Sequence, residues 1–235
     1  MPSESNWRSV KSETHENYLK TIYHLQASGI DPNVQELSTR LGVSPPAVSK
    51  MLRHLATHHL VVYTPYQPVS LTPLGEKVAL EVVRHHRLLE LYLVQNLGYG
   101  WDQVHEEAER LEHYISEEFE DTIDRLLGYP TVDPHGDPIP TRDGSVPRIV
   151  TVTLDCQENG ACVVIRRVAD EDPNLLRYLA ERGIRPGTVL VVVDREPFGG
   201  SLRLNITGRE ERITPEASRY VFVEPASCGA GGPEN

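Results

Sequence analysis

Residues 33–60 read NVQELSTRLGVSPPAVSKMLRHLATHHL, a stretch with the sequence signals of two short helices. Apolar residues recur at helical spacing up to Gly42, which predicts a helix that ends in a turn. A second helix is expected directly afterwards, with Ser44 at its N-cap and Pro45 at its first position. Two short helices joined by a glycine-containing turn predict a helix-turn-helix.

The segments on either side extend this motif to a winged helix. Apolar positions between Glu13 and Ala27 predict an earlier helix that ends near Gly29. Residues 60–72, LVVYTPYQPVSLT, are β-branched and aromatic around a Pro-Tyr-Gln-Pro turn, which predicts a two-stranded wing. Because a helix-turn-helix places its second helix in the DNA major groove, residues 1–72 are predicted to bind DNA.

Side chains at the start of the second helix are expected to reach base edges and phosphates. Ala47 can contact a thymine methyl group, Ser49 can donate a hydrogen bond, and Lys50 supplies positive charge. The candidate DNA-binding residues are Arg40, Ser44, Pro46, Ala47, Ser49, Lys50 and Arg53. Each also fits an ordinary surface position, and Ser-capped helical hairpins occur in many protein cores. The wing is what favours the DNA interpretation.

The net charge of −11 is unevenly distributed along the chain. Residues 1–72 carry 6 Lys/Arg and 5 Asp/Glu, whereas residues 73–130 carry 5 Lys/Arg and 13 Asp/Glu. Only the N-terminal third can therefore face phosphate without strong repulsion. Bound divalent cations would offset the acidic excess that follows it.

The composition is that of a globular protein, with 235 residues, 39% hydrophobic and 24% charged. This length accommodates two or three small domains. No apolar stretch is long enough for a membrane span or forms the core of a signal peptide, so a cytoplasmic location is expected. The three cysteines form no CxxC pair, which argues against a disulfide framework and a thiolate zinc site and favours reduced thiols.

Imidazoles and carboxylates recur at helical spacing between residues 86 and 113. One helix is predicted from Pro73 to a stop at Gly98, and the next from about Asp102 to Leu127. The ligand-type residues are His86 and Glu90 on the first helix, and His105, Glu109, Glu112 and His113 on the second. The last four positions fall within one arc of roughly 100°. This spacing favours a divalent-metal site, although an acidic solvated helix face gives the same pattern.

The C-terminal part is predicted to be a small all-β domain. Residues 128–148 are rich in proline and glycine, which indicates a linker or an extended connection. Five short strands then follow, IVTVTL, ACVVIRRV, TVLVVVD, SLRLNI and YVFVE, with one helix near Pro173 to Arg182. The size and pattern favour an SH3-like β-barrel.

The fold is therefore expected to be mainly α-helical with a small all-β domain. The expected parts are a winged helix-turn-helix domain (1–72), a helical metal-binding and dimerisation domain (73–140), a linker (141–149), an SH3-like domain (150–226) and a disordered tail (227–235).

This order of parts resembles the diphtheria toxin repressor family of iron- and manganese-dependent regulators, and in particular its manganese type. The motifs that carry the resemblance are ENYLKTIYHL (16–25), LGVSPPAVSKMLRHL (41–55), LTPLGEKVA (71–79), RHHRLLELYL (84–93), HEEAERLEHYIS (105–116) and PHGDPIP (134–140). Together they cover most of the chain and are far more specific than any one of them alone.

The resemblance also implies a set of metal ligands. It implies a primary site at Asn17, Glu109, Glu112 and His113, and an ancillary site at His86, Glu90 and His105 that Glu171 and Asp172 complete from the β-barrel. Asn17 stands where the family usually has Met or Asp, and Glu109 stands where the iron regulators have Cys. A set of oxygen and imidazole donors suits a harder ion such as Mn²⁺, with Fe²⁺ as the alternative and two ions per subunit.

The function implied by the resemblance is a transcriptional repressor, not an enzyme, in which the metal acts as corepressor. A homodimer would bind palindromic double-stranded operator DNA at genes for metal uptake and homeostasis, with no membrane partner. Metal binding would bias the two recognition helices toward successive major grooves, about 34 Å apart. Two alternatives remain. One is a winged-helix regulator that senses an organic ligand or redox state, and the other, less favoured, is a dinuclear metalloenzyme.

Overall fold

The computed structural model describes residues 12–147 and 150–227. The chain divides into two compact units, and the long helical segments contribute residues to both. Unit 1 consists of Met1–His86, Glu109–Thr122 and Pro140–Val146, and unit 2 consists of Arg87–Ala108, Ile123–Ile139 and Pro147–Asn235. Among the described residues, no helix combines the length and the apolar character that a membrane span requires.

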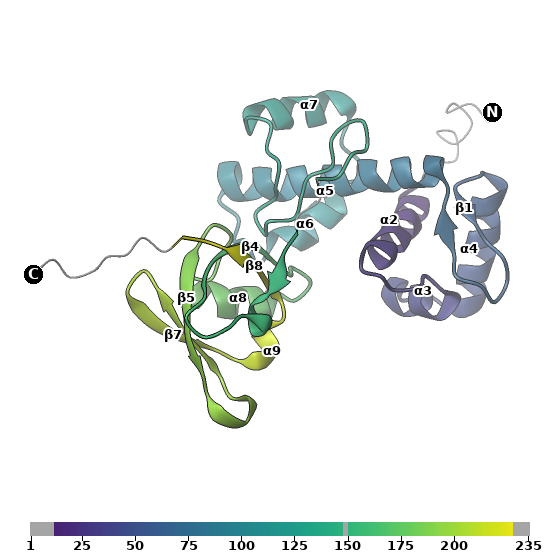
Figure 1. The fold of residues 1–235 in the computed structure, drawn as a ribbon. Coiled ribbons are helices and arrows are strands. Elements are labelled where there is room, and N and C mark those ends of the chain that lie inside the picture. Colours follow the sequence, from purple (N-terminus) through teal and green to yellow (C-terminus); the bar gives the residue numbers. More distant parts are fainter. Residues whose placement is uncertain (1–11, 148–149, 228–235) are drawn as a thin grey trace, which may run out of the picture. The chain divides into compact units, whose positions relative to one another are not determined.

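Unit 1 begins with the predicted helix-turn-helix (Figure 1). Helix α2 spans Glu13–Ala27, α3 spans Val34–Leu41 and α4 spans Pro45–Thr57. Gly42 follows α3 with φ 66°, a left-handed conformation that glycine adopts without steric cost. Ser44 occupies the N-cap position of α4 as predicted, although its side chain makes no capping hydrogen bond.

The predicted wing is confirmed as an antiparallel hairpin of β1 (Val61–Val62) and β2 (Ser70–Leu71). One apolar core joins this hairpin to α2, α3, α4 and the start of α5 (Pro73–Leu97). The buried core residues are Tyr18, Leu19, Ile22, Leu25, Leu37, Val48, Leu52, Leu55, Leu60, Val61, Val69, Val78 and Ala79. The helix-turn-helix thus shares a core with the first turns of the long helix.

The helix expected over residues 102–127 is broken. It forms α6 (Val104–Leu111) and α7 (Glu117–Leu126), with a turn between them. Ser116 starts α7 because its hydroxyl accepts a hydrogen bond from the backbone N–H of Phe119 at 3.2 Å. Acidic residues fill the first turn of α7, where the helix dipole favours negative charge. The expectation of one continuous helix is therefore wrong.

The break changes how the predicted ligands are presented. His105 and Glu109 lie one turn apart on α6, but Glu112 and His113 lie in the turn after its last residue. These four side chains do not share one helix face, so tertiary contacts must bring them together.

Unit 2 contains a six-stranded antiparallel sheet with the strand order β3-β8-β4-β5-β6-β7. The strands are β3 (Val152–Thr153), β4 (Cys162–Val168), β5 (Val189–Arg195), β6 (Leu202–Ile206), β7 (Arg209–Ile213) and β8 (Val221–Pro225). In the described part of the chain, the edge strands β3 and β7 do not pair with each other. The expected barrel is therefore an open sheet.

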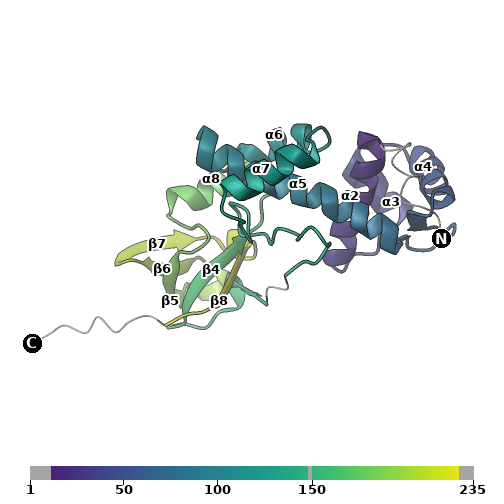
Figure 2. The ribbon, with the colours of Figure 1, turned by 90° about the horizontal axis from the view of Figure 1, so that it is seen from above.

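Helix α8 (Pro173–Glu181) lies beside this sheet and buries Leu176 and Leu179 in its apolar core (Figure 2). The short elements η1 (Leu154–Cys156), η2 (Pro197–Gly199) and α9 (Pro215–Ser218) complete the unit. The sequence pattern misses β7 because its side chains are mostly polar and exposed. The expectation of three reduced cysteines is wrong at Cys162, which is disulfide-bonded, whereas Cys156 is free and exposed.

The structure describes the proline-rich connection from Gly128 to Pro147. Val132 and Pro138 form an isolated β-bridge, and the backbone carbonyl of His135 accepts a hydrogen bond from the N–H of Val168 in β4 at 2.9 Å. Gly136 has φ 90°, and a Cβ there would lie 1.9 Å from the backbone oxygen of Arg166. Only glycine fits this close approach. The expected disordered tail, apart from Ser227, lies outside the described residues.

Candidate functional site

Glu112 is the centre of a charged group in unit 1. Its side chain is fully buried, and its two oxygens lie 2.7 and 2.9 Å from the ammonium nitrogen of Lys20. His86 Nδ1 donates to Glu112 Oε2 at 2.6 Å, and His113 Nε2 lies 3.3 Å from Glu112 Oε1. We call the full set the primary group. Its members are Glu16, Lys20, His86, Glu109, Glu112 and His113.

Helix α2 of the helix-turn-helix supplies two members of the primary group. His113 Nδ1 donates to Glu16 Oε2 at 2.6 Å, and the Lys20 ammonium donates to Glu109 Oε1 at 2.6 Å. Asn17, the ligand predicted on this helix, has a buried Oδ1 with no hydrogen-bond partner in the described part of the chain. Helix α2 is thus joined by charged contacts to α6 and the segment after it.

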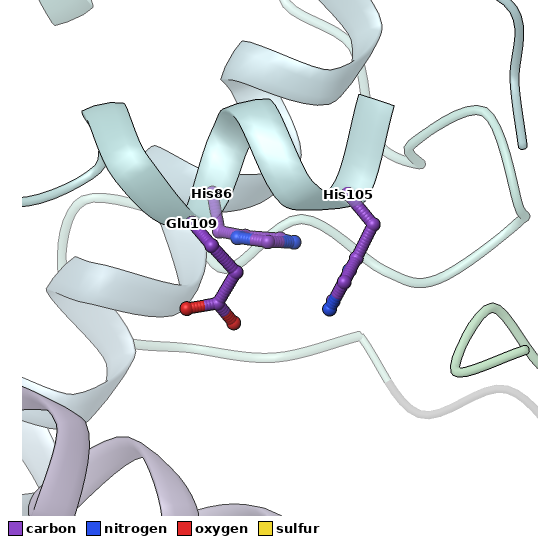
Figure 3. Close-up of side chains that lie close together, drawn as sticks. All are labelled: His86, His105 and Glu109. Atoms are coloured by element: carbon purple, nitrogen blue, oxygen red, sulfur yellow. The ribbon is translucent and has the colours of Figure 1, made fainter. Parts of the chain in front are cut away.

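His86 joins this group from α5. Figure 3 shows its imidazole beside the carboxylate of Glu109, and ligand atoms of the two side chains lie within 4.8 Å of one another. His105 lies one turn before Glu109 on α6. The resemblance implied that His86 belongs with Glu90, but the contacts of His86 include the primary-group carboxylate of Glu112.

A second group of ligand-type side chains lies in unit 2. His105 Nδ1 is 3.3 Å from Glu90 Oε1 and 3.7 Å from Asp170 Oδ2. His135 Nδ1 is 3.6 Å from Glu90 Oε2 and 4.0 Å from Asp170 Oδ2. We call Glu90, His105, His135 and Asp170 the second group. It draws on α5, α6, the proline-rich connection and the segment after β4.

His135 is placed as a metal-binding imidazole would be. Its ring is fully buried, stacks against Trp101 and places Nε2 at 2.7 Å from the Trp101 carbonyl, to which Nε2–H donates. Its Nδ1 makes no hydrogen bond to any described residue. A histidine ligand usually donates its other N–H to a backbone carbonyl or carboxylate, which fixes the ring so that the free nitrogen faces the metal.

The electrostatics of this region favour a cation. Burial lowers the pKa of His135, but the carboxylates of Glu90, Asp133 and Asp170 outweigh burial and raise it to about 9. Burial, together with the charge of Glu90, raises the pKa of Asp170, and the same causes raise the pKa of Asp133 well above its usual value. Carboxylates that attract protons this strongly also attract a divalent cation.

Asp172 and Glu171 were expected to complete the ancillary site. Asp172 is the N-cap of α8, where its carboxylate accepts a hydrogen bond from the N–H of Asn174 at 2.8 Å. Glu171 is exposed. The acidic residue that reaches His105 is Asp170, immediately before them.

The sequence interpretation missed Glu16, Lys20, Asp170 and His135. Glu16 is adjacent to the predicted ligand Asn17, and Asp170 is adjacent to Glu171. His135 lies within PHGDPIP, in the segment that was expected to be a linker. A histidine between proline and glycine in such a segment is a possible signal of function, but arguments from helical spacing do not use it.

The candidate DNA-binding side chains lie on α4, at its N-cap and near the end of α3. Exposed positions are Arg40, Ser44, Pro46, Ala47, Lys50 and Arg53, and Ser49 is half-buried. Arg40 is not free, because its Nε lies 3.2 Å from Glu36 Oε1 one turn earlier on α3.

Three protein-family descriptions match consecutive parts of the chain. Residues 11–69 match the iron-dependent repressor N-terminal DNA-binding domain, residues 72–141 match the iron-dependent repressor metal-binding and dimerisation domain, and residues 152–225 match the FeoA domain. The chain belongs to the iron-dependent repressor family. It is a metal-dependent transcriptional repressor with a helical dimerisation domain and a C-terminal FeoA domain.

Relatives of this repressor resemble it over almost its whole length. The iron-dependent repressor IdeR of Mycobacterium leprae is 33% identical over 225 residues, which cover 90% of this chain and 97% of that protein. The diphtheria toxin repressor of Corynebacterium diphtheriae is 29% identical, with the same coverage. A solved manganese-dependent transcriptional repressor in complex with manganese has a TM-score of 0.82 and 39% identity, covering 90% of this chain and all of that one.

Proposed function

We propose that this repressor uses Mn²⁺ as its corepressor, with Fe²⁺ as the alternative, and binds palindromic operator DNA as a homodimer. Its targets are proposed to be genes of metal uptake and homeostasis, and its location the cytoplasm. The observation that carries the proposal is the contact of α2 with the segment after α6, through Glu16 with His113 and Lys20 with Glu112. A change at the ligands is thereby transmitted to the DNA-binding helices.

The primary group fits one divalent cation. Glu109, Glu112 and His113 supply carboxylate and imidazole donors, as the resemblance implied. On α2, both Glu16 and the unpartnered amide oxygen of Asn17 are available as donors. A buried acceptor without a hydrogen-bond partner costs free energy, which a bound cation would remove.

The second group fits another cation, with a ligand set that differs in part from the expected one. Glu90 and His105 remain as ligands, and His135 and Asp170 take the places proposed for Glu171 and Asp172. This set contains two imidazoles and two carboxylates held by four separate segments of the chain. Two proposed groups correspond to two ions per subunit.

The metal proposal rests on donor chemistry. Within the two groups every donor is oxygen or nitrogen, and none is a thiolate, which favours a hard ion such as Mn²⁺ over softer ones. Several solved relatives are named for manganese, among them the repressor complex described above and the manganese regulator SloR, which is 31% identical with a TM-score of 0.70. The manganese-activated repressor ScaR has also been solved with bound Zn²⁺ and with bound Cd²⁺, consistent with selection by availability and geometry.

The residues of the primary group have separate roles in the proposed mechanism. These residues would hold a divalent cation, which would supply positive charge to their carboxylates. Glu16 and Asn17 hold α2, while Glu109, Glu112 and His113 hold the segment after α6. With both sides engaged, α2 and the recognition helix α4, which share one core, take one orientation in each subunit. In a dimer this favours the major-groove spacing of about 34 Å.

Two other functions make different predictions. If the chain sensed an organic ligand or redox state, the charged groups would be structural, and Glu112→Gln would leave regulated DNA binding intact. If it were a dinuclear metalloenzyme, mutations of the exposed recognition helix would leave its activity unchanged. Neither alternative gives the contacts between α2 and the metal segment a role.

The test is selection of DNA from a random-sequence pool by the full-length protein in the presence of Mn²⁺. Fluorescence anisotropy on the selected sequence then gives the affinity of wild-type and Glu112→Gln protein, with Mn²⁺ or with a chelator. We expect tight binding only for wild type with Mn²⁺. Equal affinity in all four conditions would overturn the proposal.

A further inference from the structure

Lys20 places a positive charge inside the primary group. Its side chain on α2 is only 11% exposed, and its ammonium lies 2.6 Å from Glu109 Oε1 and 2.7 Å from Glu112 Oε1. It also lies 2.9 Å from Glu112 Oε2. An ammonium has three N–H donors, so these contacts use its full capacity.

These carboxylate oxygens are the ones that the proposed function assigns to the metal. A hard divalent cation needs oxygen ligands at about 2 Å, with lone pairs directed at the ion. The ammonium of Lys20 already uses lone pairs of both carboxylates. Two cations in such close proximity also repel each other, and burial increases that repulsion because the surroundings screen it poorly.

We propose that Lys20 is a residue that sets the metal affinity: its ammonium competes with the divalent cation for Glu109 and Glu112. A cation that uses Glu109 Oε1 or either oxygen of Glu112 must displace the ammonium from that oxygen or lie close to its positive charge. The inference rests on the proposed function, because it concerns the same group. Its consequence is a higher metal concentration for activation than the carboxylates alone would require.

The charge balance of the group bears on how many ions it can hold. Glu16, Glu109 and Glu112 carry three negative charges and Lys20 carries one positive charge, which leaves two negative charges when the imidazoles are neutral. One divalent cation matches this balance. Lys20 therefore also restricts the primary group to a single ion.

Lys20 also has a role in the metal-free protein. Without metal, it joins α2 to Glu109 and Glu112 and neutralises carboxylates that would otherwise repel each other. Replacing it with a neutral side chain should therefore destabilise the metal-free protein while strengthening metal binding. A lysine with only a structural role would lower stability without strengthening metal binding.

The experiment is an Mn²⁺ titration of chelator-treated, full-length protein by calorimetry, together with thermal melts in the absence of metal. Lys20→Met and Lys20→Gln are compared with wild type, and Glu112→Gln identifies the binding event that belongs to the primary group. Lys77→Met is the matched control. It removes the same charge on α5 at a position nine residues before His86, about 13 Å away along the helix.

We expect Lys20→Met and Lys20→Gln to bind Mn²⁺ roughly tenfold tighter or more in that event, and to melt at a lower temperature without metal. Lys77→Met should match wild type. The inference is overturned if both Lys20 variants bind with wild-type or weaker affinity, or if Lys77→Met gains as much. If wild type shows no binding event that Glu112→Gln removes, the proposed function itself fails.

Discussion

His113 Nδ1, in the turn after α6, lies 2.6 Å from Glu16 Oε2 on α2. This contact joins residues 97 positions apart and connects the DNA-binding helices to the metal-binding segment. Both side chains are almost fully buried, so the pair is shielded from solvent and salt. We therefore expect the position of α2 to depend on the charge and occupancy of the primary group.

Glu16→Gln should weaken Mn²⁺ binding to the primary group by about 10- to 100-fold, because it removes the charge of a ligand or of a residue that orients one. Calorimetric titration of Mn²⁺ measures the effect. Glu13→Gln is the control on the same helix, where Glu13 accepts an exposed hydrogen bond from Tyr114. Equal losses in both variants would show that the effect is not specific to the primary group.

Asp170→Asn should remove or strongly weaken Mn²⁺ binding at the second group, whereas Glu171→Gln should leave it unchanged. Both variants remove one negative charge, and the two positions are adjacent in sequence. The difference arises because Asp170 lies 3.7 Å from His105 Nδ1, while Glu171 is exposed. Metal content after dialysis, measured by mass spectrometry, distinguishes them. A loss in Glu171→Gln with none in Asp170→Asn would contradict the proposed ligand set.

Mn²⁺ binding at the second group should strengthen as pH rises. The pKa of His135 is raised to about 9, so at pH about 7 its Nδ1 carries a proton that metal binding must displace. Calorimetry in buffers of different ionisation enthalpy should report about one proton released per ion. His135→Phe should remove this release. Binding that is independent of pH between about 6.5 and 8.5 would exclude His135 as a ligand.

Acid stability should depend on Glu120, which accepts a hydrogen bond from Arg84 at 2.6 Å and lies 3.2 Å from His85 Nε2. Burial raises the pKa of Glu120, but these two partners outweigh burial and lower it from 4.5 to about 2. Because the folded pKa lies below the unfolded one, the stabilisation is complete above pH about 5 and is lost as pH falls toward about 2.

Glu120→Gln should therefore lower the free energy of unfolding at neutral pH by on the order of 2–3 kcal/mol and flatten its dependence on pH in that window. Denaturant unfolding at several pH values measures both effects. Glu118→Gln, at an exposed position of α7, is the control. The assignment is wrong if Glu120→Gln keeps the acid dependence of wild type.

Lys50→Ala should weaken binding to all DNA sequences similarly and reduce the salt dependence of affinity by about one phosphate contact. Lys50 is exposed on α4, the proposed recognition helix. Anisotropy at several salt concentrations, with Lys77→Ala as the control, measures this slope. An unchanged slope would remove Lys50 from the DNA interface.

Local sequence patterns predicted the N-terminal part of the fold well. Apolar periodicity, Gly42 and the residues around the wing predicted α2, α3, α4 and the hairpin, because each depends on interactions between residues near each other in the chain. The break between α6 and α7 was missed, although Ser116 followed by acidic residues is a helix start signal. The polar strand β7 was missed because strand patterns rely on buried side chains.

The candidate site was predicted only where its members share a helix or a family motif. Spacing arguments found Glu109 and His105, which lie one turn apart on α6. They did not find Lys20 or Asp170, whose partners lie on segments far away in sequence. His135 was missed because its role depends on a buried ring and the Trp101 carbonyl, which only the tertiary structure brings together.

Metal binding and DNA binding are expected to be coupled through the primary group. Coupling between two ligands is reciprocal, so operator DNA must strengthen Mn²⁺ binding by the same factor by which Mn²⁺ strengthens DNA binding. The most direct measurement is the Mn²⁺ affinity of the full-length protein with and without its selected operator. We predict tighter Mn²⁺ binding in the presence of DNA for wild type and no difference for Glu112→Gln. Equal Mn²⁺ affinity with and without DNA in wild type would contradict the account.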